Sequence, residues 1–134
     1  MGNDVIYNKV QIIERCLQRI YEEYDNDSEN LNNYTKQDSI ILNIQRACEA
    51  AIDLAMHIIA ERRLGLPQNS RDAFILLCTG GLIDNTLSVR MQAMVGFRNI
   101  AVHDYQAVNL VIVKMIIEKH LDDLRRFMAV VLAL

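Results

Sequence analysis

Apolar side chains recur in alternating steps of four and three residues through the first part of this chain. They are Ile6, Val10, Ile13, Leu17, Ile20 and Tyr24. This spacing places all of them on one side of an α-helix, which has 3.6 residues per turn. No segment shows the alternation of apolar and polar residues that marks a half-buried strand. We therefore expect an amphipathic helix over residues 3–24 and further helices after it.

A second, longer helix is predicted after a polar loop at residues 25–30. Thr35 is a suitable first residue, with Asp38 three residues later in an approximate capping arrangement. The apolar positions that follow are too many for a single stripe, as expected for a helix buried between neighbours. The predicted inner face comprises Ile41, Ile44, Cys48, Ala51, Ala55, Ile58 and Arg62.

The strongest break in the chain lies at residues 64–69. Gly65 can provide a left-handed helix cap there, and Pro67 prevents the helix from continuing. Ser70 is then expected to cap a short helix over residues 71–78, which ends before a pair of glycines.

Two further helices complete the prediction. Asp84 or Asn85 begins a fourth helix that reaches about His103, and the last helix runs from about Gln106 to Leu132. The last helix again carries a periodic stripe, made of Leu110, Val113, Ile117, Leu121, Leu124, Met128 and Val131.

The composition agrees with a helical fold. Hydrophobic residues make up 51% of the chain, with one proline and no tryptophan. An aliphatic sequence with so few breakers favours helices, and 134 residues are enough to bury a core. We expect an all-α up-and-down helical bundle of four long or medium helices plus a short one, built as a single domain over residues 1–134.

A charged residue interrupts the apolar face of the predicted fourth helix. At about 100° per residue, one face comprises Leu87, Met91, Met94, Arg98, Ala101, Val102 and Tyr105. Arg98 lies near the centre of this face. An unpaired buried charge costs several kcal/mol, so Arg98 requires a partner, a water-filled cleft or a ligand. A purely structural interpretation is a salt-bridged interface arginine, with His103 favoured by the helix dipole.

A sequence motif stands at the end of this helix. The pattern Arg98-Asn99-x-x-x-His103-Asp104-Tyr105 resembles the signature of the HepT-like toxins, a branch of the HEPN superfamily of small helical proteins. Residues 41–50 and 66–74 also resemble this family at the expected separations, so the resemblance covers nearly the whole chain. It implies a homodimer with a composite arginine–histidine cleft, and a metal-independent ribonuclease that requires the RNA 2′-hydroxyl.

The residue types in the motif suit RNA cleavage. As general base, His103 would activate a ribose 2′-hydroxyl, and the second histidine of the dimer would protonate the leaving 5′-oxygen. Arg98 would hold the phosphate and stabilise the transition state. Asn99 would orient His103 or bind the substrate, or else make a structural hydrogen bond near the helix end. Asp104 either fixes the histidine or caps the last helix.

Tyr105 has two interpretations. A tyrosine near a helix end is ordinarily a structural phenol at an interface. The resemblance implies instead that Tyr105 accepts AMP from a cognate minimal nucleotidyltransferase antitoxin. A bulky anionic nucleotide beside the cleft would fill it and repel RNA phosphates.

The spacing within the motif constrains the mechanism. Arg98 and His103 are five residues apart, hence roughly 140° apart around an ideal helix. Either the helix ends near His103 and redirects it, or each arginine works beside the histidine of a partner subunit. Gly96, inside the same helix, suggests a close neighbour. If that neighbour is the same helix of a second copy, the two Arg98–His103 pairs meet across a two-fold axis.

The charge of the chain argues mildly against a dedicated nucleic-acid binder, which is usually basic. The formal net charge is −3, although a local basic cleft would still hold a short RNA segment. Candidate basic residues are Arg62, Arg63, Arg71, Arg90, Arg98, Arg125 and Arg126. Their convergence is left open by the sequence. The scattered cysteines, and the lack of any apolar run long enough to span a membrane, favour a cytoplasmic protein.

No metal and no cofactor are expected. Asp53 and His57 are four residues apart and could share a metal, but two ligands are too few. No phosphate-binding glycine loop is present, so the chain should not itself be the nucleotidyltransferase. Two alternatives to a ribonuclease toxin stay open: a non-catalytic HEPN partner that binds and serves a minimal nucleotidyltransferase, and a helical dimer whose motif is purely structural.

Overall fold

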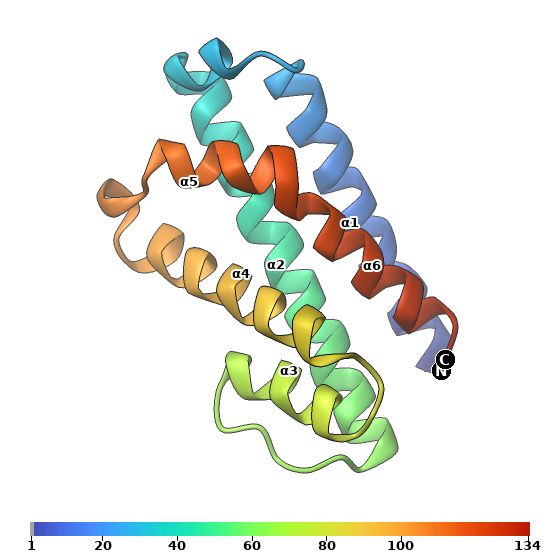
Figure 1. Ribbon diagram of the computed structural model, residues 1–134. Helices are drawn as coiled ribbons and strands as arrows, with labels where there is room; N and C mark the ends of the chain where they lie inside the picture. Colours follow the sequence, from blue (N-terminus) through green and yellow to red (C-terminus); the bar gives the residue numbers. More distant parts are fainter. Residues whose placement is uncertain (1) are drawn as a thin grey trace.

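The computed structural model describes residues 2–134, which form helices and no strand (Figure 1). The helices are α1 (Gly2–Tyr24), α2 (Tyr34–Arg62), α3 (Ser70–Thr79), α4 (Asn85–His103), α5 (Leu110–Met115) and α6 (Leu121–Leu132). A π-helical turn, η3 (Ile116–His120), joins α5 directly to α6. The predicted bundle of four long or medium helices and one short helix is confirmed. None of the described helices has both the length and the hydropathy needed to cross a membrane.

The long helix α2 is the centre of the arrangement. It packs along α1 and also contacts α3, α4 and α6 (Figure 1). This position explains why its apolar residues exceed one stripe, because neighbours cover it on several sides. Its predicted inner face is buried as far as Ile58, whereas Arg62 at its end is exposed.

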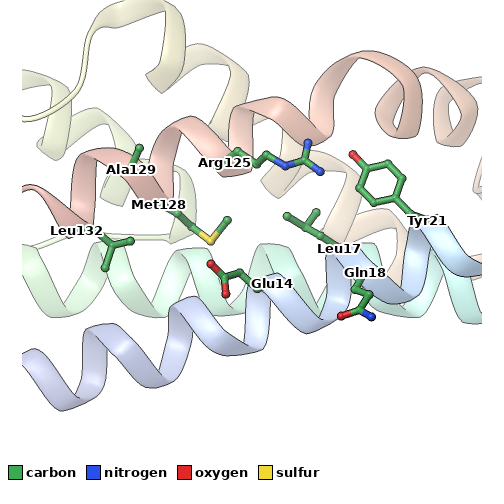
Figure 2. Close-up of a pocket in the computed structure, with 8 residues that line it drawn as sticks. All are labelled: Glu14, Leu17, Gln18, Tyr21, Arg125, Met128, Ala129 and Leu132. Carbon is green, nitrogen blue, oxygen red and sulfur yellow. The ribbon is translucent and has the colours of Figure 1, made fainter.

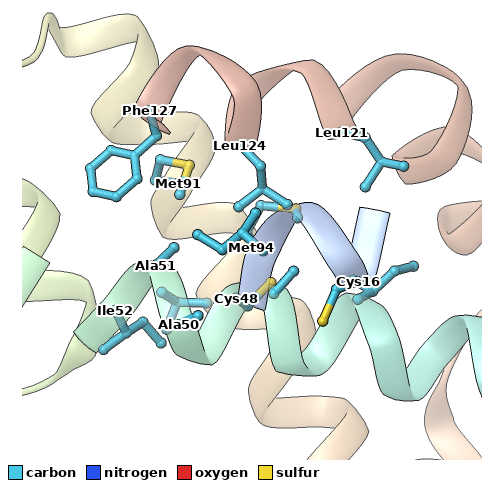
Figure 3. Close-up of a cluster of buried hydrophobic side chains, with 14 of the residues drawn as sticks. Cys16, Cys48, Ala50, Ala51, Ile52, Met91, Met94, Leu121, Leu124 and Phe127 are labelled. Carbon is cyan, nitrogen blue, oxygen red and sulfur yellow. The ribbon is translucent and has the colours of Figure 1, made fainter. Parts of the chain in front are cut away.

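The core is a single cluster of buried side chains drawn from the helices of the bundle (Figure 3). The stripe of α1 is buried from Val10 to Tyr24, and Ile6 is half-buried. Phe74 of α3 and Phe127 of α6 meet edge-to-face with ring centroids 5.5 Å apart, a preferred geometry for aromatic pairs. This contact fixes the short helix α3 against the last helix.

The predicted caps of α2 and α3 were wrong by one or two residues. The side chain of Asn33 accepts a hydrogen bond from the Lys36 amide and begins α2, so Asp38 lies in the second turn. Asn69 caps α3 in the same way, which leaves the Ser70 hydroxyl for another partner. Asparagine is as good a helix cap as serine and better than threonine, which explains both shifts.

Two loops also differ from the prediction. The left-handed cap after α2 is Arg63, with φ 54°, although Gly65 has a positive φ as well. The polar loop after α1 contains a 3₁₀ turn, η1 (Ser28–Asn32), which Asp27 caps. Of the two residues predicted to begin α4, Asp84 is the cap, because its carboxylate accepts a hydrogen bond from the Leu87 amide at 2.7 Å.

The last helix begins later than predicted and is not regular. A 3₁₀ turn, η2 (Tyr105–Ala107), follows α4, and α5 starts only after Asn109, which caps it. The π turn inserts one extra residue, which matches the two successive steps of four from Val113 to Leu121. Glu118 in this turn accepts a hydrogen bond from the Tyr24 hydroxyl at 2.5 Å. The π turn therefore keeps the stripe buried and attaches the last helix to the end of α1.

We predict that Phe127→Ala lowers the free energy of unfolding by about 3–5 kcal/mol, because it leaves a cavity at a fully buried aromatic pair. Chemical denaturation measures this change. Leu66→Ala, at an 85% exposed position, is the control and should change stability by less than about 0.5 kcal/mol. Equal effects of the two substitutions would contradict the packing described here.

Candidate functional site

The helix α4 separates the two principal motif residues. Its buried side contains Leu87, Met91, Met94 and Ala101. Arg98 belongs to this side, as predicted, with a side chain that is only 19% exposed. Val102 was predicted to join it but is 42% exposed. His103, the last residue of α4, is exposed, so within one chain the structure does not bring His103 into contact with Arg98.

The Arg98 guanidinium is only partly neutralised by its neighbours. Nη2 donates a hydrogen bond to the Ser70 hydroxyl at 3.1 Å, and Nη1 lies 4.0 Å from a carboxylate oxygen of Glu49. Nε is buried and has no hydrogen-bond partner among the described residues. A carboxylate at that distance is a loose ion pair. The arginine therefore keeps positive charge that a phosphate could use.

A second arginine, Arg71, follows directly after Ser70 in the chain. The Arg71 guanidinium passes over Gly96, where a Cβ atom would stand 2.7 Å from Nη2. The close approach of another helix predicted at Gly96 is not found within this chain, where the neighbour is the Arg71 side chain. Arg71 and Asn99 also line one surface hollow with Asn69, Ser70 and Val95. The start of α3 therefore brings one further cationic group, Arg71, against α4 beside Gly96 and Asn99.

His103 stands at the end of an exposed face of α4. Helical spacing places it on the same face as Asn99 and Gly96, and its side chain makes no hydrogen bond or ion pair to another described residue. The exposed face also includes Val89, Ala93 and Ile100. The helix ends directly after this histidine but does not turn it towards Arg98, so of the two predicted arrangements the one with a partner subunit's histidine stays a prediction. Its imidazole is accessible to a ligand or a second molecule.

Tyr105 lies just past the end of α4, on η2. Its side chain is 41% exposed, and its hydroxyl donates a hydrogen bond to Oδ1 of Asp38 at 2.5 Å. Partial burial, this hydrogen bond and the negative charge of Asp38 together raise the pKa of Tyr105 to about 12. The preceding residue, Asp104, is exposed, and the last helix is capped by Asn109 rather than by Asp104. The other predicted role of Asp104, fixing His103, stays a prediction.

Most of the other candidate arginines do not join Arg98. Each of three is close to an aspartate: Arg90 to Asp123, Arg125 to Asp122 and Arg126 to Asp84. Arg62 and Arg63 are exposed at the end of α2. Among the arginines named from the sequence, Arg71 is the one that follows directly after Ser70, the residue that accepts a hydrogen bond from Arg98, so any basic region around Arg98 is small.

Another hollow, of about 450 Å³, lies between α1 and α6 (Figure 2). Arg125 lies across the ring of Tyr21 there, 5.1 Å from its centroid, which is within the range of a cation–π contact. The other lining residues are Glu14, Leu17, Gln18, Met128, Ala129 and Leu132. This set includes no histidine or thiol and no residue of the motif, so we assign no chemistry to it.

The two residues considered as metal ligands, Asp53 and His57, each contact the charged side chain of another residue. Asp53 pairs with Lys9 at 3.0 Å, and His57 lies 3.2 Å from Glu61. No group of three or more metal-ligating side chains occurs among residues 4–134. Cys16 and Cys48 are buried free thiols, and Cys78 is half-buried.

Three residues around the motif were not assigned a role there by the sequence. Ser70 and Glu49 contact Arg98, and Asp38 contacts Tyr105. Ser70 and Asp38 stood out only as possible caps. Each of the three is at least 28 residues away in sequence from its partner, so no local spacing could have revealed the contact.

Comparison with known proteins defines the class to which this helical fold belongs. Residues 10–131 match the family described as ribonuclease HepT-like. The chain is 50% identical over 131 residues to the mRNA nuclease HepT of Shewanella oneidensis strain MR-1, covering 98% of each protein. This chain therefore belongs to the HepT-like ribonuclease family.

Solved structures agree with this membership. A toxin–antitoxin crystal structure with AMP-PNP contains a chain that superposes with a TM-score of 0.94 at 48% identity, covering 98% of this chain and 99% of that one. A tri-AMPylated HEPN toxin of Shewanella oneidensis, in complex with an MNT antitoxin, superposes with a TM-score of 0.92 at 48% identity, covering 98% of each chain. A Bacillus subtilis cytosolic protein of unknown function, YutE, shares the fold with a TM-score of 0.84 at 14% identity, covering 98% of this chain and 88% of that one.

We predict that Gly96→Ala does not destabilise the protein and raises its stability by up to about 1 kcal/mol, because alanine favours a helix interior. The new Cβ would meet only the flexible end of Arg71, which can move. Denaturant unfolding at a fixed protein concentration measures the effect, with Arg71→Ala as the second arm of a double-mutant cycle. A loss of stability that disappears in the Arg71→Ala background would show that Arg71 is held rigidly instead.

Proposed function

We propose that this chain is the toxin of a bacterial toxin–antitoxin system and a metal-independent endoribonuclease of the cytoplasm. It acts as a single HEPN-like domain, residues 1–134, that is active as a homodimer. Arg98, Asn99 and His103 form the RNA site, and a cognate nucleotidyltransferase antitoxin silences the toxin by transferring AMP to Tyr105. The observation that carries this proposal is the partly neutralised Arg98 guanidinium, bonded to Ser70, with an exposed His103 on the same helix.

The substrate phosphate would bind on the cationic side of α4. Arg98 retains uncompensated charge because Glu49 is 4.0 Å away, and the Arg71 side chain lies over Gly96 of the same helix, α4. Planar guanidinium groups suit the oxygens of a phosphate. Asn69 and Asn99 line the same hollow and offer amide groups to ribose or phosphate oxygens. This small cationic region is compatible with a net charge of −3, because only a short RNA segment has to be held.

A second copy of the chain would complete the site. Within one chain, Arg98 and His103 lie on different sides of α4. The exposed face of α4 that ends at His103 carries apolar Val89, Ala93 and Ile100, which suits contact with the same face of a partner. A two-fold axis beside this face would place two histidines and the Arg71 groups that cross Gly96 around one cleft. Each Arg98 would reach this cleft from the neighbouring side of its helix.

The chemistry then follows from these groups. One His103 imidazole removes the proton of a ribose 2′-hydroxyl, whose oxygen attacks the adjacent phosphorus. The other protonates the leaving 5′-oxygen, giving a 2′,3′-cyclic phosphate. Arg98 stabilises the extra negative charge of the phosphorane. Histidine moves protons near neutrality, so this route needs no metal ion.

The names of the relatives support this proposal. The Shewanella oneidensis protein is named an mRNA nuclease, and a similar HEPN toxin is described as tri-AMPylated and bound to an MNT antitoxin. A further toxin–antitoxin structure is a mutant in which a tyrosine is replaced by alanine. Tyr105 suits the acceptor role because its hydroxyl is at an accessible corner of this fold, next to His103.

A second candidate is a non-catalytic partner that binds and serves a minimal nucleotidyltransferase. The acidic balance of the chain and the separation of Arg98 from His103 in a single copy favour it. It predicts AMP addition without RNA cleavage, and the same experiments therefore distinguish the two functions.

We predict that the purified, unmodified protein cleaves RNA in the presence of EDTA and leaves 2′,3′-cyclic phosphate ends. His103→Ala and Arg98→Ala should each lower the rate by about 10²–10⁴-fold, as expected for loss of an acid–base group or a phosphate ligand. Gel analysis of end-labelled RNA measures the rate, and Arg126→Ala, on α6, is the control. Cleavage by both variants at the parent rate would refute the site.

We predict that co-expression with the antitoxin raises the intact mass by one or more AMP units and abolishes RNA cleavage. Tyr105→Phe should remove the mass shift, because the ring is kept and only the acceptor oxygen is lost. Tyr34→Phe, at a tyrosine that is 79% exposed, is the matched control and should keep the shift. A Tyr105→Phe protein that still gains AMP would exclude this acceptor.

A further inference from the structure

Tyr105 is tied to a carboxylate that is distant in sequence. Its hydroxyl donates a 2.5 Å hydrogen bond to Asp38, which precedes it by 67 residues. Asp38 lies in the second turn of α2, a regular 29-residue helix. Tyr105 belongs to the three-residue turn η2. The contact therefore connects the corner after α4 to the longest helix of the bundle, although both side chains are at the surface.

We infer that Asp38 is the proton acceptor for modification of Tyr105, and that it holds the phenol oxygen in place for that reaction. This inference rests on the proposed role of Tyr105 as the AMP acceptor. It assigns a catalytic part of the antitoxin's reaction to a residue of the toxin itself. The geometry supports this inference because the carboxylate oxygen of Asp38 already accepts a hydrogen bond from the phenolic proton that must leave.

The reaction balances with a nucleoside triphosphate as the donor. The Tyr105 oxygen forms a bond to the α-phosphorus of ATP while the bond from that phosphorus to the β-phosphate bridging oxygen breaks. Pyrophosphate leaves with the electron pair of the broken bond. The phenolic proton passes to Asp38, which becomes a carboxylic acid and later releases the proton to water. No oxidant, reductant or further reactant is needed.

The alternative route, attack by a phenolate formed in advance, is disfavoured in this environment. Burial and the adjacent Asp38 raise the pKa of Tyr105 to about 12, so only about one molecule in 10⁵ is ionised at pH 7. Among the described residues, Asp38 is the charged group that affects this phenol. The carboxylate that suppresses ionisation is also the base positioned to take the proton during attack.

The chain contains a matched pair that serves as an internal control. Tyr24 donates a hydrogen bond of the same length to Glu118, and burial together with Glu118 raises the pKa of Tyr24 to about 12 as well. Tyr24 is only 2% exposed, so no antitoxin can reach it. The two pairs share their chemistry and differ in accessibility.

The test compares Asp38→Asn with Glu118→Gln in the full-length toxin. Each variant is incubated with saturating antitoxin and ATP, and the first AMP addition is timed by intact-mass spectrometry. Asp38→Asn should slow this step by about 10²–10⁴-fold, the usual contribution of a general base. Glu118→Gln should keep the parent rate. Asp38→Glu, which keeps a carboxylate on a longer stem, should recover part of the loss.

A pH profile separates a proton acceptor from a purely structural residue. Without Asp38 the phenol must ionise to solvent, so the Asp38→Asn rate should rise about tenfold per pH unit below the tyrosine pKa. The parent rate should depend less steeply on pH over the same range. Any further AMP units are attached to hydroxyl groups other than the Tyr105 phenol, which is already esterified. Asp38→Asn should therefore leave the rates of these later additions unchanged.

Each outcome is decisive. An Asp38→Asn rate equal to or faster than the parent rate would overturn the inference. An increase in the KM for the antitoxin without a lower maximal rate would also overturn it, because Asp38 would then be a docking residue. If Tyr105→Phe loses AMP addition while Asp38→Asn keeps it, the proposed function survives and only the inference fails. If Tyr105→Phe is still modified, the acceptor assignment itself fails. Circular dichroism confirms that the variants are folded.

Discussion

The placement of a guanidinium on the buried side of α4 is the constraint around which the site is built. A buried charge without partners is costly, and Arg98 meets this cost through Ser70 on α3 and Glu49 on α2. These contacts require the start of α3 to lie against the middle of α4. The same approach brings Arg71 across Gly96, where a larger residue would force the arginine aside. One charged side chain thus fixes how three helices meet.

The fold was predictable because helical periodicity is a local property. Steps of three and four residues identified the buried stripe of α1, the inner face of α2 and the core positions of the last helix. The helix ends were less predictable, since Asn33 and Asn69 compete with neighbouring Thr35 and Ser70 for the same capping role. The π turn could not be predicted with certainty from the stripe, because two steps of four also fit a regular helix.

Only part of the candidate site could be predicted from the sequence. The spacing of Arg98 and His103 correctly indicated that they do not share a helix face, and the apolar neighbours of Arg98 indicated its burial. The partners Ser70, Glu49 and Asp38 were hidden because tertiary packing, rather than sequence distance, brings them to the motif. Residue type gave no help for Ser70 and Asp38, since serine and acidic side chains near helix starts are ordinarily caps.

The tie between Tyr105 and Asp38 has a consequence for the shape of the molecule. The phenol supplies the proton of that bond, and an oxygen converted to a phosphodiester has none left to donate. Esterification at this atom would also set a new anion against an existing carboxylate, so the two would repel. The turn η2 would then lose its hydrogen bond to α2, and the attached nucleotide would move away from that helix. The covalent modification would thus produce a local change of conformation.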